Sequence, residues 1–298
     1  MKSYIRMFLK YKFILFFLAF ISVLSSVFSI ISIYFSGLFI DTIIEATSSN
    51  EIFLMAFIFF GVLFFNIILN FFAGYIYSPF KEKMVYEFKK TILENSQTLN
   101  KKYEKSYIAK RVDEDSRQVT TFILENYSTV FIKLIELFVV GFLIFQVDST
   151  VGFIALIVCP LYFLLYIFFR KSLFRSSLGI RESSSIFFSD YTNKFDEVPN
   201  GVNIENSFVG YYKSFKTYIF INTFLNSSQS LIVAIMQVTI FIIGGVSVLN
   251  GYTTIGLLSI TMSYFNQLIN NISYYMQLAK RYKIVQASIE RISEFISD

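Results

Sequence analysis

Long apolar tracts alternate with charged stretches along the 298-residue chain. A helix needs about 20 mostly apolar residues to cross the hydrocarbon core of a bilayer, and five tracts are long enough. The last tract, residues 217–279, carries no charge, and Asn250-Gly251-Tyr252 in its middle is a turn signal that divides it in two. The pattern therefore predicts six membrane-spanning helices, at residues 13–40, 52–80, 127–147, 150–169, 220–249 and 254–279.

The composition agrees with this pattern and narrows the fold class. The chain is 55% hydrophobic and only 16% charged, with a mean hydropathy of +0.58, which is too apolar for an ordinary water-soluble domain. It has 12 Gly and 3 Pro, so helix breakers are scarce. We expect an all-α polytopic membrane protein. The one cysteine, Cys159, excludes an internal disulfide and a cysteine-based metal cluster, and we expect no metal site.

The distribution of basic residues predicts the orientation. Of the 26 Lys and Arg residues, only Lys133 lies inside a predicted span, and the others flank one side of the membrane. The connections on the other side carry only acidic charges, at Asp41, Glu45, Glu51 and Asp148. Basic flanks stay in the cytoplasm. We expect a multi-pass protein of a cell membrane, of the bacterial inner-membrane type, with both termini cytoplasmic.

Two long connections on the cytoplasmic side, residues 81–126 and 170–216, are charged but keep apolar positions such as Phe88 and Ile92. They could be solvated loops. Their similar lengths, each between two pairs of spans, favour helices that extend from the membrane and contact a cytoplasmic partner twice. Helix signals change near residues 100–111 and 198–210, where we expect each extension to turn.

The C-terminal segment, residues 280–298, continues the last span as a charged helix. Apolar residues recur along it at spacings of three and four, which predicts a one-sided seam. The seam residues are Leu278, Tyr282, Val285, Ile289, Ile292 and Ile296. This helix could pack on the other cytoplasmic extensions, or it could lead into another domain.

Four segments resemble the six-helix transmembrane domain of type 1 ATP-binding cassette (ABC) exporters. KSYIAKRVDEDSRQV (105–119) looks like the first cytoplasmic turn of that family, with Arg111 and Asp115 in its Arg-x3-Asp-like pattern, and EVPNGVNIENSF (197–208) is similar to the second turn. NGYTTIGLL (250–258) is similar to the outer hairpin before the sixth span. VQASIERISEFIS (285–297) looks like the stretch that leads into the nucleotide-binding domain, although Asn270-Asn271 stands where many relatives have a proline.

The resemblance implies a dimer of two such domains, identical or different, with the two turns docked on ATPase domains. The residues that would dock are Tyr103, Ser106, Tyr107, Ile108, Asn203, Ile204, Glu205 and Phe208. No Gly-x4-Gly-Lys-Ser/Thr loop occurs in the sequence, so these residues cannot bind and hydrolyse ATP alone. ATP and Mg²⁺ are expected on a nucleotide-binding domain that is fused downstream or supplied as a separate subunit.

Polar residues within the predicted spans are candidates for a substrate cavity: Asn66, Asn70, Lys133, Glu136, Gln229, Gln237, Asn266 and Asn270, with Gln267, Asn271 and Gln277 nearby. Lys133 and Glu136 share one helix face, either beside an internal pathway or as a mutually stabilising pair near the inner boundary. The amides could line a partly hydrated cavity, or they could form hydrogen bonds between helices.

Three functions remain open at this point. The membrane half of an ATP-driven exporter of an amphipathic or hydrophobic substrate, such as a peptide, lipid-like molecule or drug, agrees best with the resemblance. An ion-coupled carrier would be expected to have more titratable groups within its spans. A membrane-embedded enzyme would need acids, bases or nucleophiles there, and the chain has no His, one Cys and a single intramembrane Lys and Glu.

Overall fold

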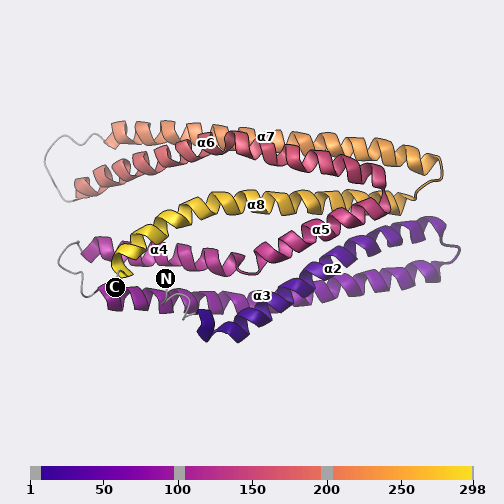
Figure 1. Ribbon diagram of the computed structural model, residues 1–298, viewed down its shortest axis with the longest axis horizontal. Coiled ribbons are helices and arrows are strands. Elements are labelled where there is room, and N and C mark those ends of the chain that lie inside the picture. Colours follow the sequence, from indigo (N-terminus) through magenta and orange to yellow (C-terminus); the bar gives the residue numbers. More distant parts are fainter. Residues whose placement is uncertain (1–7, 97–104, 196–203, 297–298) are drawn as a thin grey trace. The chain divides into compact units, whose positions relative to one another are not determined.

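The computed structural model describes residues 8–96, 105–195 and 204–296 as a series of long helices (Figure 1). The helices are α2 (Lys12–Glu45), α3 (Ser49–Ser96), α4 (Lys105–Asn126), α5 (Thr129–Val147), α6 (Ser149–Phe195), α7 (Ile204–Leu249) and α8 (Ile255–Ile296). The all-α fold expected from the scarcity of Gly and Pro is confirmed. Each predicted cytoplasmic connection contains two helices, and the residues between them lie outside the described ranges. The turns expected at 100–111 and 198–210 are too long, because residues 105–111 and 204–210 are already helical.

Five stretches of the described residues are long and apolar enough to cross a membrane: Lys12–Glu45, Ser49–Glu94, Val112–Val147, Ser149–Tyr191 and Ile204–Leu249. They contain the first five predicted spans. The sixth predicted span lies in α8, which is not among the five, so the number six is not confirmed and the sixth span stays a prediction. The physical reason is the set of amides in α8 at Asn266, Gln267, Asn270 and Asn271, which lowers its hydropathy.

The chain divides into two compact units. One unit comprises residues 1–152 and 243–298, and the other comprises residues 153–242. Within the first unit, α8 packs against α2, α3, α4 and α5. This central position explains how α8 can be both polar and buried, because its side chains meet other helices of the same unit. Ile260, Phe265 and Asn271 are completely buried.

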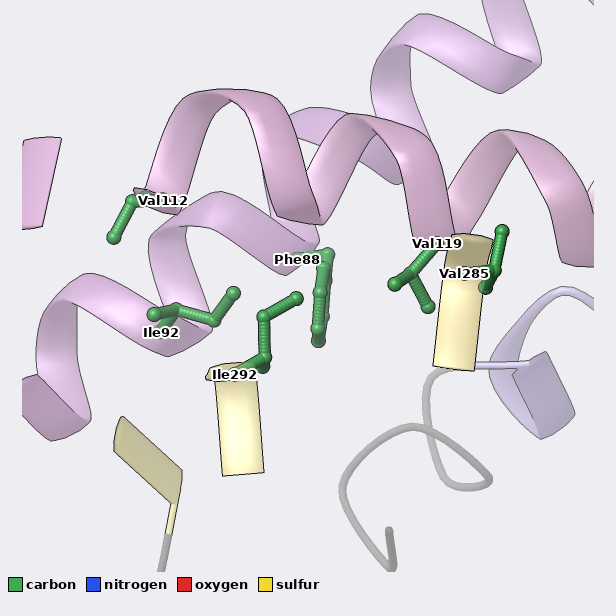
Figure 2. Close-up of a cluster of buried hydrophobic side chains, with 6 residues drawn as sticks. All are labelled: Phe88, Ile92, Val112, Val119, Val285 and Ile292. Atoms are coloured by element: carbon green, nitrogen blue, oxygen red, sulfur yellow. The ribbon is translucent and has the colours of Figure 1, made fainter. Parts of the chain in front are cut away.

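The predicted cytoplasmic ends of α3, α4 and α8 pack together, and we call this group, residues 81–96, 105–126 and 280–296, the first stalk. Its apolar core contains Phe88, Ile92, Val112, Val119, Val285 and Ile292. Figure 2 shows Ile292 of α8 beside Phe88 and Ile92 of α3, and Val285 beside Val119 of α4. The seam predicted along the tail is thus used, at least in part, to pack on the other extensions.

The ends of α6 and α7 in the second unit form the second stalk, residues 170–195 and 204–216. Aromatic rings join the two helices. Phe187 of α6 lies 5.9 Å from the ring centroid of Tyr211 and 5.8 Å from that of Phe208. Many apolar side chains of this stalk are exposed, including Ile186, Phe188, Phe208, Val209, Tyr212 and Phe215. In Figure 1 the two helices run side by side along this segment.

The predicted turn at Asn250-Gly251 is confirmed. α7 ends at Leu249, and Gly251 has φ 73°, a left-handed conformation that glycine adopts without strain. The amide of Gly251 donates to the carbonyl of Val248, and the amide of Tyr252 donates to that of Ser247. These bonds satisfy the last carbonyls of α7 and reverse the chain before α8 begins at Ile255.

Candidate functional site

Ser25 of α2 lies between the two predicted cavity amides of α3. Its hydroxyl is 3.0 Å from Oδ1 of Asn66 and 3.1 Å from Oδ1 of Asn70. Nδ2 of Asn70 also donates to Oδ1 of Asn66, at 2.8 Å. The spacing of four therefore places the two amides together. The hydroxyl of Ser25 connects them to the neighbouring helix α2.

Ser26, the next residue of α2, contacts the charged pair of α5. Its hydroxyl donates to Glu136, whose other oxygen accepts from the ammonium of Lys133 at 2.7 Å. The side chain of Glu136 is only 5% exposed, and that of Lys133 is 31% exposed. A buried carboxylate requires this kind of compensation. The two side chains share one helix face and form an ion pair, and whether they line a pathway stays a prediction.

The amides of α8 have different environments. Asn266 is half-buried and Asn270 is exposed, whereas Asn271 is completely buried. Among the described residues, neither side-chain polar atom of Asn271 has a hydrogen-bond partner, nor has Oε1 of Gln267 one turn earlier. Each unsatisfied buried polar group costs about 1–3 kcal/mol. These two residues are therefore candidates for contact with water, substrate or a partner that another conformation supplies.

The second unit contributes the remaining predicted amides, Gln229 and Gln237 of α7. Gln229 is buried and Gln237 is half-buried. On the same helix, polar residues missed by the sequence analysis line a cavity of about 480 Å³: Thr223, Asn226, Ser227 and Ser230. Their spacing of three, one and three residues marks one helix face. That spacing is the signal in the sequence that could have identified them.

Two segments that carry the family resemblance meet in the first stalk. The hydroxyl of Ser288 in α8 is 2.8 Å from Oδ1 of Asp115 and 2.8 Å from Oε1 of Gln118, both in α4. Asp115 is 2% exposed, and Ser288 is completely buried. This polar contact lies among the apolar residues of the stalk core. It fixes the register of the tail helix on α4, because a shifted helix would leave a buried carboxylate without this hydrogen bond.

The predicted outer end of the first unit contains a close helix contact. Oδ1 and Oδ2 of Asp41 accept hydrogen bonds from the amide of Gly256 and the hydroxyl of Thr254, both at 2.6 Å. The carboxylate therefore caps the N-terminus of α8. A Cβ atom on Gly256 would lie 2.1 Å from the carbonyl oxygen of Gly37, so only glycine permits this approach of α8 to α2.

The predicted docking residues are only partly described. Ile204 is half-buried, whereas Glu205 and Phe208 are exposed at the start of α7. Tyr103 and Asn203 lie outside the described residues, and so do the side chains of Ser106, Tyr107 and Ile108 at the start of α4. The structure therefore brings Phe208 to the end of the second stalk, and the docking role of all eight residues stays a prediction.

A family model for the ABC transporter transmembrane region matches residues 15–183, which is more than half of the chain. The chain belongs to this family. None of the curated proteins compared with it matches significantly. As an ABC transporter membrane domain, it is a multi-pass membrane protein that serves transport, and membership implies in general a nucleotide-binding partner and dimerisation. The family match includes α2 to α5 and most of α6.

Proposed function

We propose that this ABC transporter membrane domain is the membrane half of an ATP-driven exporter that works by alternating access. The observation that carries the proposal is the first stalk. There the tail of α8 shares a dry core with α3 and α4 and is tied to α4 by the buried contact between Ser288 and Asp115. A force applied at the end of this stalk would move three helices together.

The helices are long enough to act as levers. α3 has 48 residues, or about 72 Å at 1.5 Å per residue, against a hydrocarbon core of about 30 Å. ATP binding would close two cytoplasmic nucleotide-binding domains, and the turns at the stalk ends would pass this movement to the spans. ATP and Mg²⁺ would be held by those domains, fused to the tail or present as separate subunits, and this chain would supply no catalytic residue.

The polar groups of α8 support an internal pathway. Asn271 and Gln267 have buried polar atoms without partners among the described residues, which an alternative conformation or water could satisfy. In the other unit, the polar face of α7 lines an open hollow of its own surface. With apolar and aromatic side chains around such groups, the substrate class that fits is amphipathic or hydrophobic, such as a peptide, a lipid-like molecule or a drug.

The test is transport into proteoliposomes that contain the protein with its nucleotide-binding partner. We expect uptake of an amphipathic dye to require ATP. Replacing Ile204 and Phe208 together with Ala should leave at least half of the ATP turnover while transport falls about ten-fold, because docking then no longer transmits the movement. The matched control is Val209→Ala, which changes an exposed apolar residue next to Phe208 and should affect neither rate.

Two outcomes would contradict this function. Uptake that proceeds without ATP and responds to an ion gradient would favour the ion-coupled carrier instead. Full coupling in the Ile204 and Phe208 variant, and also in a variant with Tyr107 and Ile108 replaced by Ala, would show that the stalk ends do not transmit force.

A further inference from the structure

A cavity of about 630 Å³ lies between α3, α4 and α8 in the first unit, at the base of the first stalk. This volume is within the range of small-molecule sites. Charged residues of both signs and an aromatic ring line it, including Lys81, Glu114, Arg117, Phe122, Glu125 and Arg281. The cavity is separate from the amides of the spans and from the predicted docking residues.

The predicted membrane boundary passes through this cavity. Lys81 follows the second span directly, Glu125 precedes the third span by two residues, and Arg281 follows the sixth span by two. Three helices thus bring charged residues within two positions of the predicted spans to one place. That depth is where phospholipid phosphates lie, and basic pockets between helices on the cytoplasmic side bind such head groups.

The cations of the cavity retain donors for a phosphate. Arg281 places one nitrogen, Nη1, 3.1 Å from Glu125, and Arg117 places its Nη1 2.9 Å from Glu82. A guanidinium has five N–H groups, so each arginine has N–H groups beyond those on this nitrogen. Lys81 holds its ammonium 5.8 Å from the ring of Tyr77, whose buried hydroxyl has no hydrogen-bond partner among the described residues.

We propose that this cavity binds the phosphate of an anionic phospholipid of the inner leaflet, held by Lys81, Arg117 and Arg281. Glu125 of the lining holds Arg281 by an ion pair, and Glu82 of α3 holds Arg117 in the same way. Phe122 with Ile284 and Val285 supplies an apolar wall for the glycerol end of the acyl chains. This lipid site is independent of the proposed export function, because the lipid is a bound component of the protein and need not be transported.

The chain contains no Trp, so Phe122→Trp introduces a unique fluorophore at the cavity. The variant is reconstituted in vesicles of phosphatidylcholine that contain increasing fractions of phosphatidylglycerol with a nitroxide at carbon 5 of one acyl chain. A parallel series uses nitroxide-labelled phosphatidylcholine. We expect labelled phosphatidylglycerol to reach half-maximal quenching at a fraction at least five-fold lower than labelled phosphatidylcholine does. The reason is that each basic residue near anionic lipid contributes about a five-fold preference.

Substitutions then test the residues of the site. Arg281→Gln and Lys81→Gln should each reduce the preference about five-fold, and Arg281→Lys should keep most of it. Arg170→Gln is the matched control, because Arg170 follows the fourth span directly but does not line the cavity. It should leave the preference unchanged. Thermal unfolding of each variant shows that the fold persists.

Three results would overturn the proposal. Equal quenching by the two lipids would show that the cavity does not select a phosphate with net negative charge. An equal loss of preference in Arg170→Gln would assign the effect to general surface charge. A saturable change in Trp emission with millimolar inorganic phosphate, without any lipid preference, would assign the cavity to a soluble phosphate compound.

Discussion

The two stalks of this protein are built in different ways from helices of similar length. In the first stalk three helices surround an apolar core, and Phe88 in that core is 1% exposed. In the second stalk two helices are joined by aromatic rings, and Phe188 remains 59% exposed. Both lie beyond the predicted spans, so lipid cannot cover these surfaces along their whole length. The first stalk is therefore complete within one chain, whereas the second exposes apolar surface of the kind that marks a binding site.

This difference indicates separate tasks. In the proposed mechanism, a stalk with its own core would transmit movement without help, because its helices are held by burial and by the contact between Asp115 and Ser288. A stalk with exposed aromatics is stabilised when a partner covers it. We expect the second stalk to be more rigid in the assembled transporter than in the isolated protein.

The largest expected effect comes from emptying the core of the first stalk. Phe88→Ala should lower the free energy of unfolding of this region by about 3–5 kcal/mol, because it removes a fully buried ring and leaves a cavity. Tyr212→Ala in the second stalk should cost less than about 1 kcal/mol in the isolated protein, since that side chain is 55% exposed. Thermal unfolding in detergent measures both. Equal losses would remove the distinction between the stalks.

The next effect concerns the buried polar contact. Ser288→Ala should destabilise the first stalk by about 1–3 kcal/mol, because Asp115 loses a hydrogen bond that water cannot easily replace. Ser176→Ala is a control of the same chemistry, since its hydroxyl donates only to carbonyls of its own helix, α6. Limited proteolysis of the tail reports the difference. A tail that stays equally protected in Ser288→Ala would show that apolar packing alone holds it.

A smaller effect is expected from the aromatic junction of the second stalk. Phe187→Ala removes the ring that contacts Phe208 and Tyr211, and such aromatic contacts contribute about 0.5–1.5 kcal/mol each beyond burial. The distribution of distances between spin labels placed on α6 and α7 should broaden in this variant. Unchanged distances would mean that the junction does not depend on these rings.

The smallest effect is a pH dependence confined to the first stalk. The hydrogen bond from Lys89 of α3 lowers the pKa of Asp113 in α4 below its usual value. Because the folded pKa is lowered, this contribution is present above the ordinary Asp pKa and is lost as the pH falls through the lowered value. The pair is exposed, so the contribution is a few tenths of a kcal/mol. When unfolding is measured between pH 7 and pH 3, Asp113→Asn should remove the contribution of this pair to the pH dependence of stability.

The sequence predicted the long helices well because their cause is local. Long apolar stretches with few charges identify spans directly, and the spacing along Val285, Ile289 and Ile292 identified the face of the tail that packs. The partners of those residues could not be predicted, since they come from distant segments. Local hydropathy does not show how deeply α8 is buried. The amides of α8 lower its hydropathy, whereas its burial comes from other helices of its unit.

The candidate site was predicted only by residue type. The spacing of four correctly put Asn66 beside Asn70, and the spacing of three put Lys133 beside Glu136. The hydroxyls that join these pairs, Ser25 and Ser26, were not foreseen, since a serine in an apolar tract is not distinctive by itself. The contact of Asp115 with Ser288 could not be predicted either, because 173 positions separate the two residues.

Amide hydrogen exchange, measured in both stalks of the isolated protein and of the assembled transporter, tests the central claim most directly. We predict that residues 86–94, 112–124 and 285–292 exchange slowly in both samples, whereas residues 170–191 and 204–216 exchange quickly in isolation and slow down at least ten-fold on assembly. Rapid exchange in the first stalk of the isolated protein, or no change in the second on assembly, would contradict the account.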